Sequence, residues 1–284
     1  MQDVFIQFYG VRGSYPVSSP KVARYGGNTS SILISGENLR LIFDAGTGII
    51  NIGEEIEKNE IERKKVDIFL THLHLDHIQG LPFFKPIFDP DFRINIFCPD
   101  YQNVSVEDFI YSLFNDPISP ISDHGIKAKI NIVKLPLTEV KTIAVDGNIS
   151  VSCKKEDSHP LSGVLIYKLS VDDRHMVFAT DVESADGFND EMVDFIKGSH
   201  ILIHDSQYFD SHYHNRNDSR IGFGHSTCSM AVRNALVCEV EKLYLFHYHP
   251  DYSDKKLKKM LKKARGRFKQ TYLARELMKF RLRS

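Results

Sequence analysis

Three histidines and one aspartate stand within six consecutive positions, at His72, His74, Asp76 and His77. The chain has 13 histidines in 284 residues, so chance is a poor explanation for this cluster. Neutral imidazole binds transition metal ions, and a neighbouring carboxylate adds negative charge for a second dication. The cluster therefore predicts a metal site.

The spacing within this run indicates how its side chains divide between two metal ions. His72 and His74 lie two positions apart and can point the same way from an extended chain, whereas Asp76 and His77 are adjacent and diverge. Metal ions in two-metal hydrolytic sites lie about 3.5–4 Å apart. Two metals need more ligands than this run supplies, so further ligands are expected elsewhere in the chain.

The elements around the run predict where it lies in the fold. An apolar segment at residues 66–70 predicts a strand, and the segment after His77 predicts a turn that enters a short helix. A loop of this kind places side chains at the carboxyl edge of a sheet, where sites of α/β proteins form.

The pattern His-x-His-x-Asp-His, with Thr71 before it and Gly80 after it, resembles the signature of the metallo-β-lactamase superfamily. The resemblance implies a third histidine, an aspartate that bridges the two metals and a final histidine, each at the end of a strand. The matching positions are His159, Asp181 and His247. The segment after the last position departs from the family pattern, so His249 is an alternative ligand or a supporting residue.

The resemblance also implies how the ligands are shared. One metal would be held by His72, His74 and His159. The other would be held by Asp76, His77 and His247. Asp181 and a hydroxide would lie between the two ions, with Zn²⁺ as the first choice of metal and Mn²⁺ as the second.

The segment Gly-His-Ser-Thr at residues 224–227 precedes a predicted helix from Thr227 to Val237, which Ser226 or Thr227 would cap. Free N–H groups at a helix amino end, beside a histidine, suit a phosphate oxygen or a leaving alkoxide. The segment resembles the superfamily branch that contains ribonuclease Z and small phosphodiesterases. By that resemblance His225 is a general acid or transition-state stabiliser, and it is counted with Asp76 as catalytic.

The amino-terminal part of the chain is similar to the same branch in three glycine-rich segments, at residues 10–16, 24–31 and 41–48. Asp44 follows a predicted strand there. A carboxylate at a strand end can orient a ligand histidine through the ring nitrogen that does not bind metal.

Short β-rich runs alternate with helical patterns along the whole chain. The strands are expected at residues 4–9, 30–35, 39–43, 94–98, 129–134 and 164–169, and the helices at 49–58, 104–114 and 189–197. No linker or repeat divides the sequence. This order predicts an α/β fold, a four-layer αββα sandwich of the metallo-β-lactamase type, in a single domain over residues 1–284.

Composition limits the class of protein. No apolar run approaches the ~18 residues that cross a bilayer, so a soluble, cytoplasmic protein with no membrane partner is expected. The four cysteines show no Cys-x-x-Cys spacing, which predicts ordinary buried thiols. The net charge is −1, yet residues 254–284 hold thirteen Lys and Arg against two acids. A solvated helix face at residues 255–265 is favoured over an RNA contact.

Two enzyme hypotheses follow, and they differ in the size of the substrate. The favoured one is a dinuclear-metal phosphodiesterase that hydrolyses a small phosphodiester, such as a cyclic nucleotide, by attack of the bridging hydroxide. The alternative is a ribonuclease Z-like endoribonuclease, or another hydrolase of lactones or thioesters.

The distance between two expected ligands favours the small substrate. Relatives that process tRNA commonly carry an arm between the third histidine and the bridging aspartate, whereas His159 and Asp181 are 22 residues apart. Nucleic acid is therefore an unlikely partner on this prediction, and the resemblance implies a homodimer. The expected loop at residues 207–223 is a candidate lid or subunit contact, with His212, His214 and Arg216 as possible substrate contacts.

Overall fold

The structure is a computed structural model that describes residues 3–59, 63–101, 103–122, 125–160 and 163–282. The chain divides into two compact units. Unit 1 comprises residues 1–10, 28–137 and 276–284, and unit 2 comprises residues 11–27 and 138–275. Each unit is described by itself, and the expectation of one domain over the whole chain stays a prediction.

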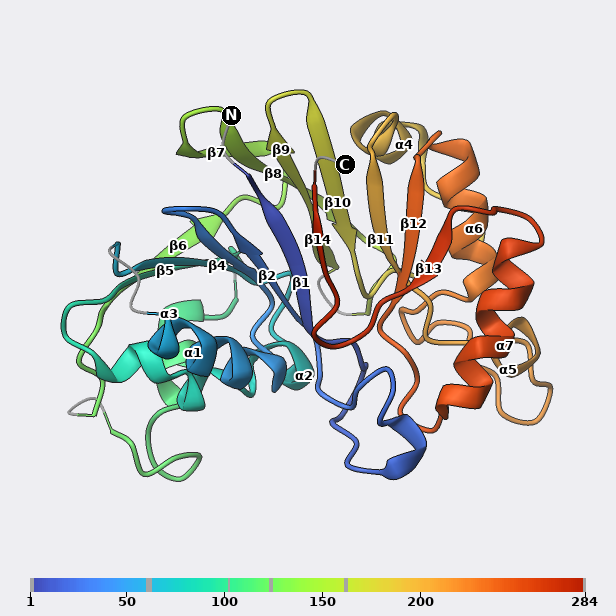
Figure 1. Cartoon of the computed structure of the whole chain (residues 1–284). Coiled ribbons are helices and arrows are strands. Elements are labelled where there is room, and N and C mark those ends of the chain that lie inside the picture. Colours follow the sequence, from blue (N-terminus) through green and yellow to red (C-terminus); the bar gives the residue numbers. More distant parts are fainter. Residues whose placement is uncertain (1–2, 60–62, 102, 123–124, 161–162, 283–284) are drawn as a thin grey trace. The chain divides into compact units, whose positions relative to one another are not determined.

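Unit 1 contains a seven-stranded sheet in the order β14-β1-β2-β3-β4-β5-β6 (Figure 1). Strands β3 to β6 run parallel, and the other neighbours are antiparallel. The strands are β1 (Phe5–Gly10), β2 (Ser31–Ser35), β3 (Arg40–Phe43), β4 (Lys65–Phe69), β5 (Arg93–Pro99), β6 (Lys129–Leu135) and β14 (Lys279–Arg281). The helices are α1 (Gly48–Lys58), α2 (Leu75–Ile78), α3 (Val106–Ser112) and the 3₁₀ turns η2 (Leu81–Phe83) and η3 (Lys85–Phe88).

The core of unit 1 forms where α1 and α3 cover the parallel strands. Ile52 of α1 and Ile110 of α3 belong to one buried cluster with Ile68 of β4 and Ile96 of β5. The apolar side chains of α1 recur every three or four residues and so face the sheet together. This packing fixes the carboxyl end of β4, from which the histidine-rich loop begins.

Unit 2 contains a second seven-stranded sheet, in the order β13-β12-β11-β10-β9-β8-β7. Strands β10 to β13 run parallel, and the others are antiparallel. The strands are β7 (Lys141–Asp146), β8 (Ile149–Glu156), β9 (Val164–Val171), β10 (Arg174–Ala179), β11 (Ile201–Asp205), β12 (Lys242–Phe246) and β13 (Thr271–Leu273). The helices are η1 (Pro20–Val22), α4 (Asp190–Ile196), α5 (Asp210–Tyr213), α6 (Cys228–Val237) and α7 (Asp254–Arg265).

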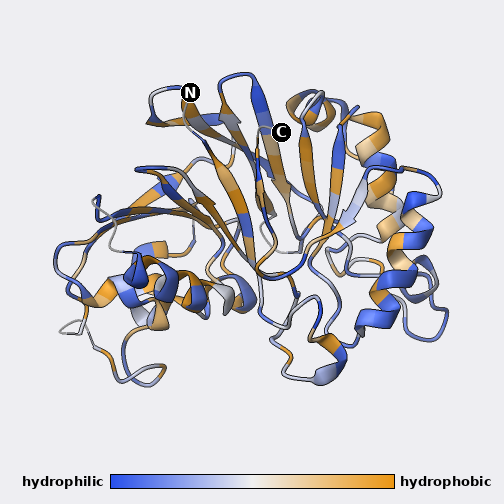
Figure 2. Cartoon of the chain, in the orientation of Figure 1, coloured by the Kyte–Doolittle hydropathy of each residue, from blue (hydrophilic) through white to orange (hydrophobic). Residues whose placement is uncertain are grey.

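The two long helices of unit 2 differ in polarity. Figure 2 shows α7 largely hydrophilic and α6 more hydrophobic. Helix α6 packs on β11 and β12, whereas α7 buries a single stripe of Leu257, Met260 and Ala264. Both helices begin at a side-chain cap, from Thr227 in α6 and Ser253 in α7.

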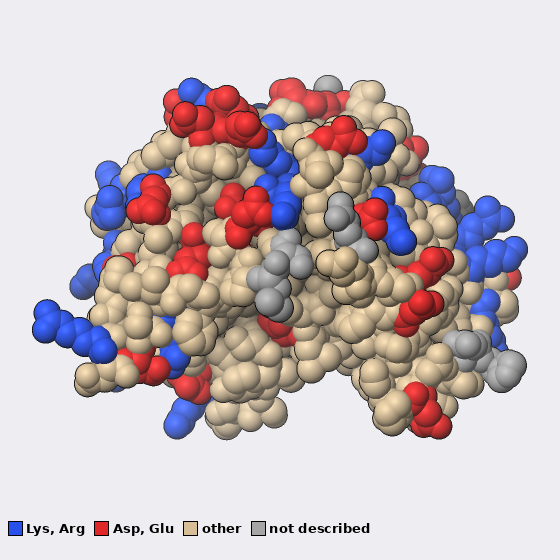
Figure 3. Space-filling view, turned by 180° about the vertical axis from the view of Figure 1, so that it is seen from behind, with Lys and Arg blue, Asp and Glu red and all other residues tan. Residues whose placement is uncertain are grey.

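The structure agrees with most of the predicted elements, with bounds that differ by one or two residues. The segment expected as an irregular loop at residues 207–223 contains the short helix α5, so that expectation was wrong in part. All four cysteines are buried and free, as predicted. Among the described helices, none combines the length and the apolar character that a bilayer span requires. Figure 3 shows acidic and basic side chains interspersed on one face, in keeping with a net charge of −1.

Candidate metal centre

The histidine-rich loop of unit 1 brings together the four side chains predicted from the motif. The His72 ring centroid lies 4.5 Å from that of His74 and 4.3 Å from that of His77. Asp76 places Oδ2 3.4 Å from Nε2 of His77. His72, Asp76 and His77 are buried, and His74 is exposed. The loop therefore presents imidazole and carboxylate donors in one place, as the spacing predicts.

Asp44 holds this loop from the end of β3. Its fully buried carboxylate lies 2.7 Å from His77 Nδ1 and accepts hydrogen bonds of 2.9 Å from the Thr71 N–H, the Thr71 hydroxyl and the Ser30 hydroxyl. Binding at Nδ1 leaves Nε2 of His77 free to face a metal, which is the common arrangement for ligand histidines. The structure thus gives Asp44 the contact that the sequence predicts.

In unit 2, three parallel strands end side by side and carry candidate ligands. Asp181 follows β10, Asp205 ends β11 and His247 follows β12. Asp181 and His247 have φ of 56° and 59°, in the left-handed region that costs non-glycine residues about 1–2 kcal/mol. Strain of this kind persists where the surroundings determine the conformation, and it is common at functional sites.

Four side chains of unit 2 form a compact donor group. One ligand atom from each of Asp181, Asp205, His225 and His247 lies within 4.8 Å of the others. His247 Nε2 is 3.2 Å from Asp181 Oδ2, and His225 Nδ1 is 2.8 Å from Asp205 Oδ2. The rings of His225 and His247 stack with centroids 5.1 Å apart. His159 stands beside this group, with its ring centroid 5.3 Å from that of His225.

A glycine and a glutamate position His159 and the segment before His225. The Glu183 carboxylate accepts hydrogen bonds of 2.7 Å from the N–H groups of Gly222 and Gly224. The Gly224 carbonyl in turn lies 3.0 Å from Nδ1 of His159. A Cβ on Gly224, whose φ is 80°, would lie 2.2 Å from that nitrogen, so only glycine fits there.

Asp205 is a candidate site residue that the sequence interpretation missed. Its Oδ1 accepts 3.0 Å hydrogen bonds from the N–H groups of Gln207 and Ser226, and Oδ2 accepts one of 3.2 Å from the Asp181 N–H. The available signal was the apolar strand that ends in a carboxylate, the same pattern that points to Asp181. Asp205 and the His225 ring form an acid–imidazole pair.

Ser226, Thr227 and His249 were predicted as supporting or substrate-contacting residues, and the structure gives them different surroundings. Ser226 donates to the Val182 carbonyl at 2.6 Å, and Thr227 caps α6, so both hydroxyls support the fold around His225. His249 lies outside the donor group, against the rings of His212 and Tyr252, with centroids 5.1 and 5.2 Å away. Burial lowers the pKa of His249 to about 4. Within unit 2, therefore, His247 and not His249 lies beside Asp181.

The first glycine-rich segment supports the loop that carries His247. The buried Arg12 guanidinium donates to the carbonyls of Gly26, His249 and Tyr252 at 2.8, 3.2 and 2.7 Å. A Cβ on Gly13 would lie 2.4 Å from the Cε1 of His247. The segment thus fixes the His247 loop by hydrogen bonds and by close approach.

The chemistry of these donors fits divalent metal ions. Two buried carboxylates in unit 2, Asp181 and Asp205, lie close together, and burying like charges is costly unless cations accompany them. Nitrogen and carboxylate oxygen donors suit Zn²⁺, Mn²⁺ and Fe²⁺. The rings of His77 and His225 are both oriented by a carboxylate at Nδ1, as in ligand and catalytic histidines.

Comparison with known proteins gives matches over most of the chain. The family model described as "Beta-lactamase superfamily domain" matches residues 39–248. A ribonuclease Z of Picrophilus torridus is 26% identical over 97% of this chain and 94% of its own length. The metallo-beta-lactamase fold protein YhfI from Bacillus subtilis aligns with a TM-score of 0.70 and 16% identity, over 99% of this chain and 100% of its own. The short form of human tRNase Z aligns with a TM-score of 0.68 and 20% identity, over 97% and 98%.

Proposed function

The chain belongs to the β-lactamase superfamily, and from this premise we propose that it is a metallo-β-lactamase-fold hydrolase of the ribonuclease Z branch that cleaves phosphodiester bonds in RNA. The predicted α/β fold class and the predicted metal-dependent hydrolase are confirmed by the same comparisons. The ribonuclease Z relatives favour the alternative function over the cyclic-nucleotide one. They also count against the expectation that nucleic acid is an unlikely partner.

The fold implies divalent metal ions, typically two, and the donor group of unit 2 fits such an ion. When bound, such ions lower the pKa of water towards neutrality and offset the charge of a phosphodiester. The division of ligands implied by the family resemblance stays a proposal, as does zinc rather than manganese. Cytoplasmic location and a homodimer likewise stay predictions.

The pairing of His225 with Asp205 is the observation that carries the proposal. Asp205 accepts a hydrogen bond of 2.8 Å from the Nδ1–H of His225 and stabilises the protonated ring, so Nε2 can deliver a proton to a departing oxygen. His225 also precedes α6, whose first N–H groups favour negative charge. A histidine held in this way beside Asp181 and His247 suits the leaving group of a phosphodiester.

The test is an assay of the metal-loaded protein against a precursor tRNA and a panel of 3′,5′-cyclic mononucleotides, with a chelator control. We expect chelator-sensitive cleavage of the precursor tRNA. Turnover of a cyclic nucleotide alone would contradict the proposal and establish a small phosphodiesterase. Inactivity on both would return lactone and thioester hydrolysis to consideration.

Two variants separate leaving-group chemistry from metal binding. His225→Ala should lower turnover strongly and leave the metal content intact, whereas Asp181→Asn should lower both. Elemental analysis alongside kinetics measures the difference. Loss of metal in His225→Ala would end the assignment of His225 as general acid, and equal metal in Asp181→Asn would remove Asp181 from the metal ligands.

A small phosphodiester remains the second candidate because of one structural observation. Most of the interval of 22 residues between His159 and Asp181 is taken by the antiparallel strands β9 and β10. An arm that grips a tRNA is therefore not inserted within the described part of that interval. If RNA is the substrate, another surface of the chain must hold it.

A further inference from the structure

Unit 2 has an open groove of about 490 Å³ along the first turns of α7. Its walls combine aromatic rings, hydroxyl groups and lysines. The lining residues are Phe209, Ser211, His212, Tyr252, Ser253, Lys255, Lys256 and Lys259. A groove with basic and aromatic walls has the composition of a nucleic-acid contact.

The charge on α7 is strongly one-sided. The helix carries seven Lys and Arg and a single acid, Asp254. That acid is already engaged, because its carboxylate accepts hydrogen bonds from the N–H groups of Arg24 and Tyr25. Lys263 forms an ion pair with Asp210. The structure records no ion pair for the three groove lysines over the residues it describes, and all three residues are exposed.

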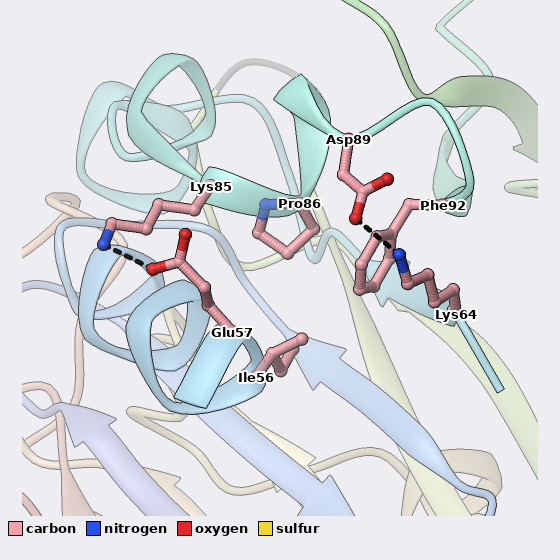
Figure 4. Close-up of a pocket in the computed structure, with 7 residues that line it drawn as sticks. All are labelled: Ile56, Glu57, Lys64, Lys85, Pro86, Asp89 and Phe92. Atoms are coloured by element: carbon pink, nitrogen blue, oxygen red, sulfur yellow. Dashed lines mark hydrogen bonds and ion pairs between the residues drawn. The ribbon is translucent and has the colours of Figure 1, made fainter. Parts of the chain in front are cut away.

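A pocket in unit 1 provides a contrast to the α7 groove. The cavity of about 380 Å³ in unit 1 also contains two lysines (Figure 4). Lys85 pairs with Glu57 at 2.7 Å, and Lys64 pairs with Asp89 at 2.9 Å. Carboxylates therefore neutralise the lysines of that cavity, whereas the α7 groove keeps its positive charge.

One lysine is held in place against the groove wall. The Lys256 ammonium lies 3.7 Å from the centroid of the Tyr252 ring, a cation–π contact. The Tyr252 hydroxyl is 2.8 Å from His212 Nδ1 and accepts from the Phe209 N–H at 3.2 Å. Burial lowers the pKa of Lys256. The charge of Asp251 offsets part of that effect, and an approaching anion would add further opposite charge beside this partly desolvated ammonium.

The groove is connected to the catalytic group of unit 2 by a row of rings. His212 in the groove lies 5.1 Å from His249, which lies 5.8 Å from Tyr208, which lies 6.1 Å from His225, measured between centroids. Three ring contacts thus join the groove lysines to the proposed general acid. A chain bound in the groove would reach the neighbourhood of His225 without leaving unit 2.

We propose that the α7 groove binds backbone phosphates of the RNA substrate at a distance from the bond that is cleaved. The identity of this ligand rests on the proposed function, and the groove itself stands on its own geometry and charge. The groove lysines lie on the exposed face of α7, and the proposal gives that face the RNA contact that the sequence analysis ranked second. The groove also provides a surface that can bind RNA in this chain, in which the strands β9 and β10 take the place of an inserted tRNA-binding arm.

The expected effect follows from counterion release. Each phosphate neutralised on single-stranded nucleic acid contributes about −0.7 to the slope of log K against log salt concentration. Three lysines therefore contribute a slope of about −2. Between 50 and 200 mM salt, the affinity of the wild type should fall about 20-fold more than that of a variant without them.

The test uses a groove triple variant that combines Lys255→Gln, Lys256→Gln and Lys259→Gln. The control triple variant changes three other exposed lysines that have no recorded ion pair in the described structure, by Lys127→Gln, Lys129→Gln and Lys141→Gln. Glutamine preserves helix propensity and removes one charge at each site, so both triples change the net charge equally. Binding of fluorescein-labelled mature tRNA is measured by anisotropy across the salt range. Cleavage of precursor tRNA and of bis(p-nitrophenyl) phosphate is measured in parallel.

We expect the groove triple to flatten the salt slope and raise KM for precursor tRNA, while hydrolysis of the small ester and the control triple stay at wild-type levels. Equal slopes for the groove triple and the wild type, or no tRNA binding by the wild type, would overturn the groove assignment. Groove-dependent binding by a wild type that cleaves no RNA would instead overturn the proposed function and leave the groove as an RNA site.

Discussion

Asp205→Asn is the substitution that tests the centre of unit 2 most directly. The change keeps the shape of the side chain and removes its charge. Asp205 is fully buried, and its two oxygens accept from His225 Nδ1 and from the N–H groups of Asp181, Gln207 and Ser226. Every one of these partners is a donor, so the amide NH₂ of asparagine faces donors in either orientation.

The magnitude follows from those contacts. Each buried donor left without an acceptor costs about 1–3 kcal/mol, and the amide NH₂ faces two such donors, so we expect a loss of ~2–6 kcal/mol in the free energy of unfolding. Loss of the negative charge also removes the stabilisation of a protonated His225. A neutral amide in place of the acid of an acid–imidazole pair costs about 10²–10⁴ in turnover.

The assay is kcat/KM on precursor tRNA and on bis(p-nitrophenyl) phosphate, with metal content and thermal midpoint measured on the same samples. Asp67→Asn is the matched control, because Asp67 is a buried acid whose recorded partners are Lys65 and Asn95. It should lose stability and keep its activity. Activity of Asp205→Asn within about threefold of the wild type on both substrates would refute the role given to this carboxylate.

Three further predictions concern a close contact of Gly13, the burial of His249 and the burial of the four cysteines. Gly13→Ala should lower metal content and activity together, because its Cβ would lie 2.4 Å from His247 Cε1; elemental analysis and kinetics check this. The free energy of unfolding should fall as pH drops from ~6.5 towards 4, because burial lowers the pKa of His249 to about 4 and the unfolded chain takes up the proton first. His249→Gln should flatten this pH dependence in thermal melts at pH 5 and 7.5. An unchanged difference between the two melts would contradict the prediction. Burial raises the pKa of Cys98 to about 12 and those of the other thiols to about 11, so all four should react with a disulfide reagent at pH 8 only after unfolding; prompt labelling of the folded protein would disprove this.

The motif by itself determined the class of chemistry. His72, His74, Asp76 and His77 are close in sequence, so the local chain alone brings their donors together. The strand before them follows from hydrophobic patterning, and the short helix α2 contains Asp76 and His77. Asp44, Asp181 and His225 also stand at the end or the start of predicted elements, and the resemblance to a known family singled out Asp181 and His225. Their roles stay predictions.

Only the tertiary structure decided the contacts of Asp205, the place of His249 and the surroundings of the α7 lysines. Asp205 meets His225 because β10, β11 and β12 pair in parallel and end at one edge, a relation between segments far apart in sequence. His249 carries the same side chain as His247, yet the backbone at His247, with φ of 59°, turns that ring towards Asp181. The sequence shows the lysines of α7 as one face of a helix, and only the structure places Tyr252 and Phe209 beside them in one groove. Long-range pairing and packing set these contacts, and no local pattern encodes them.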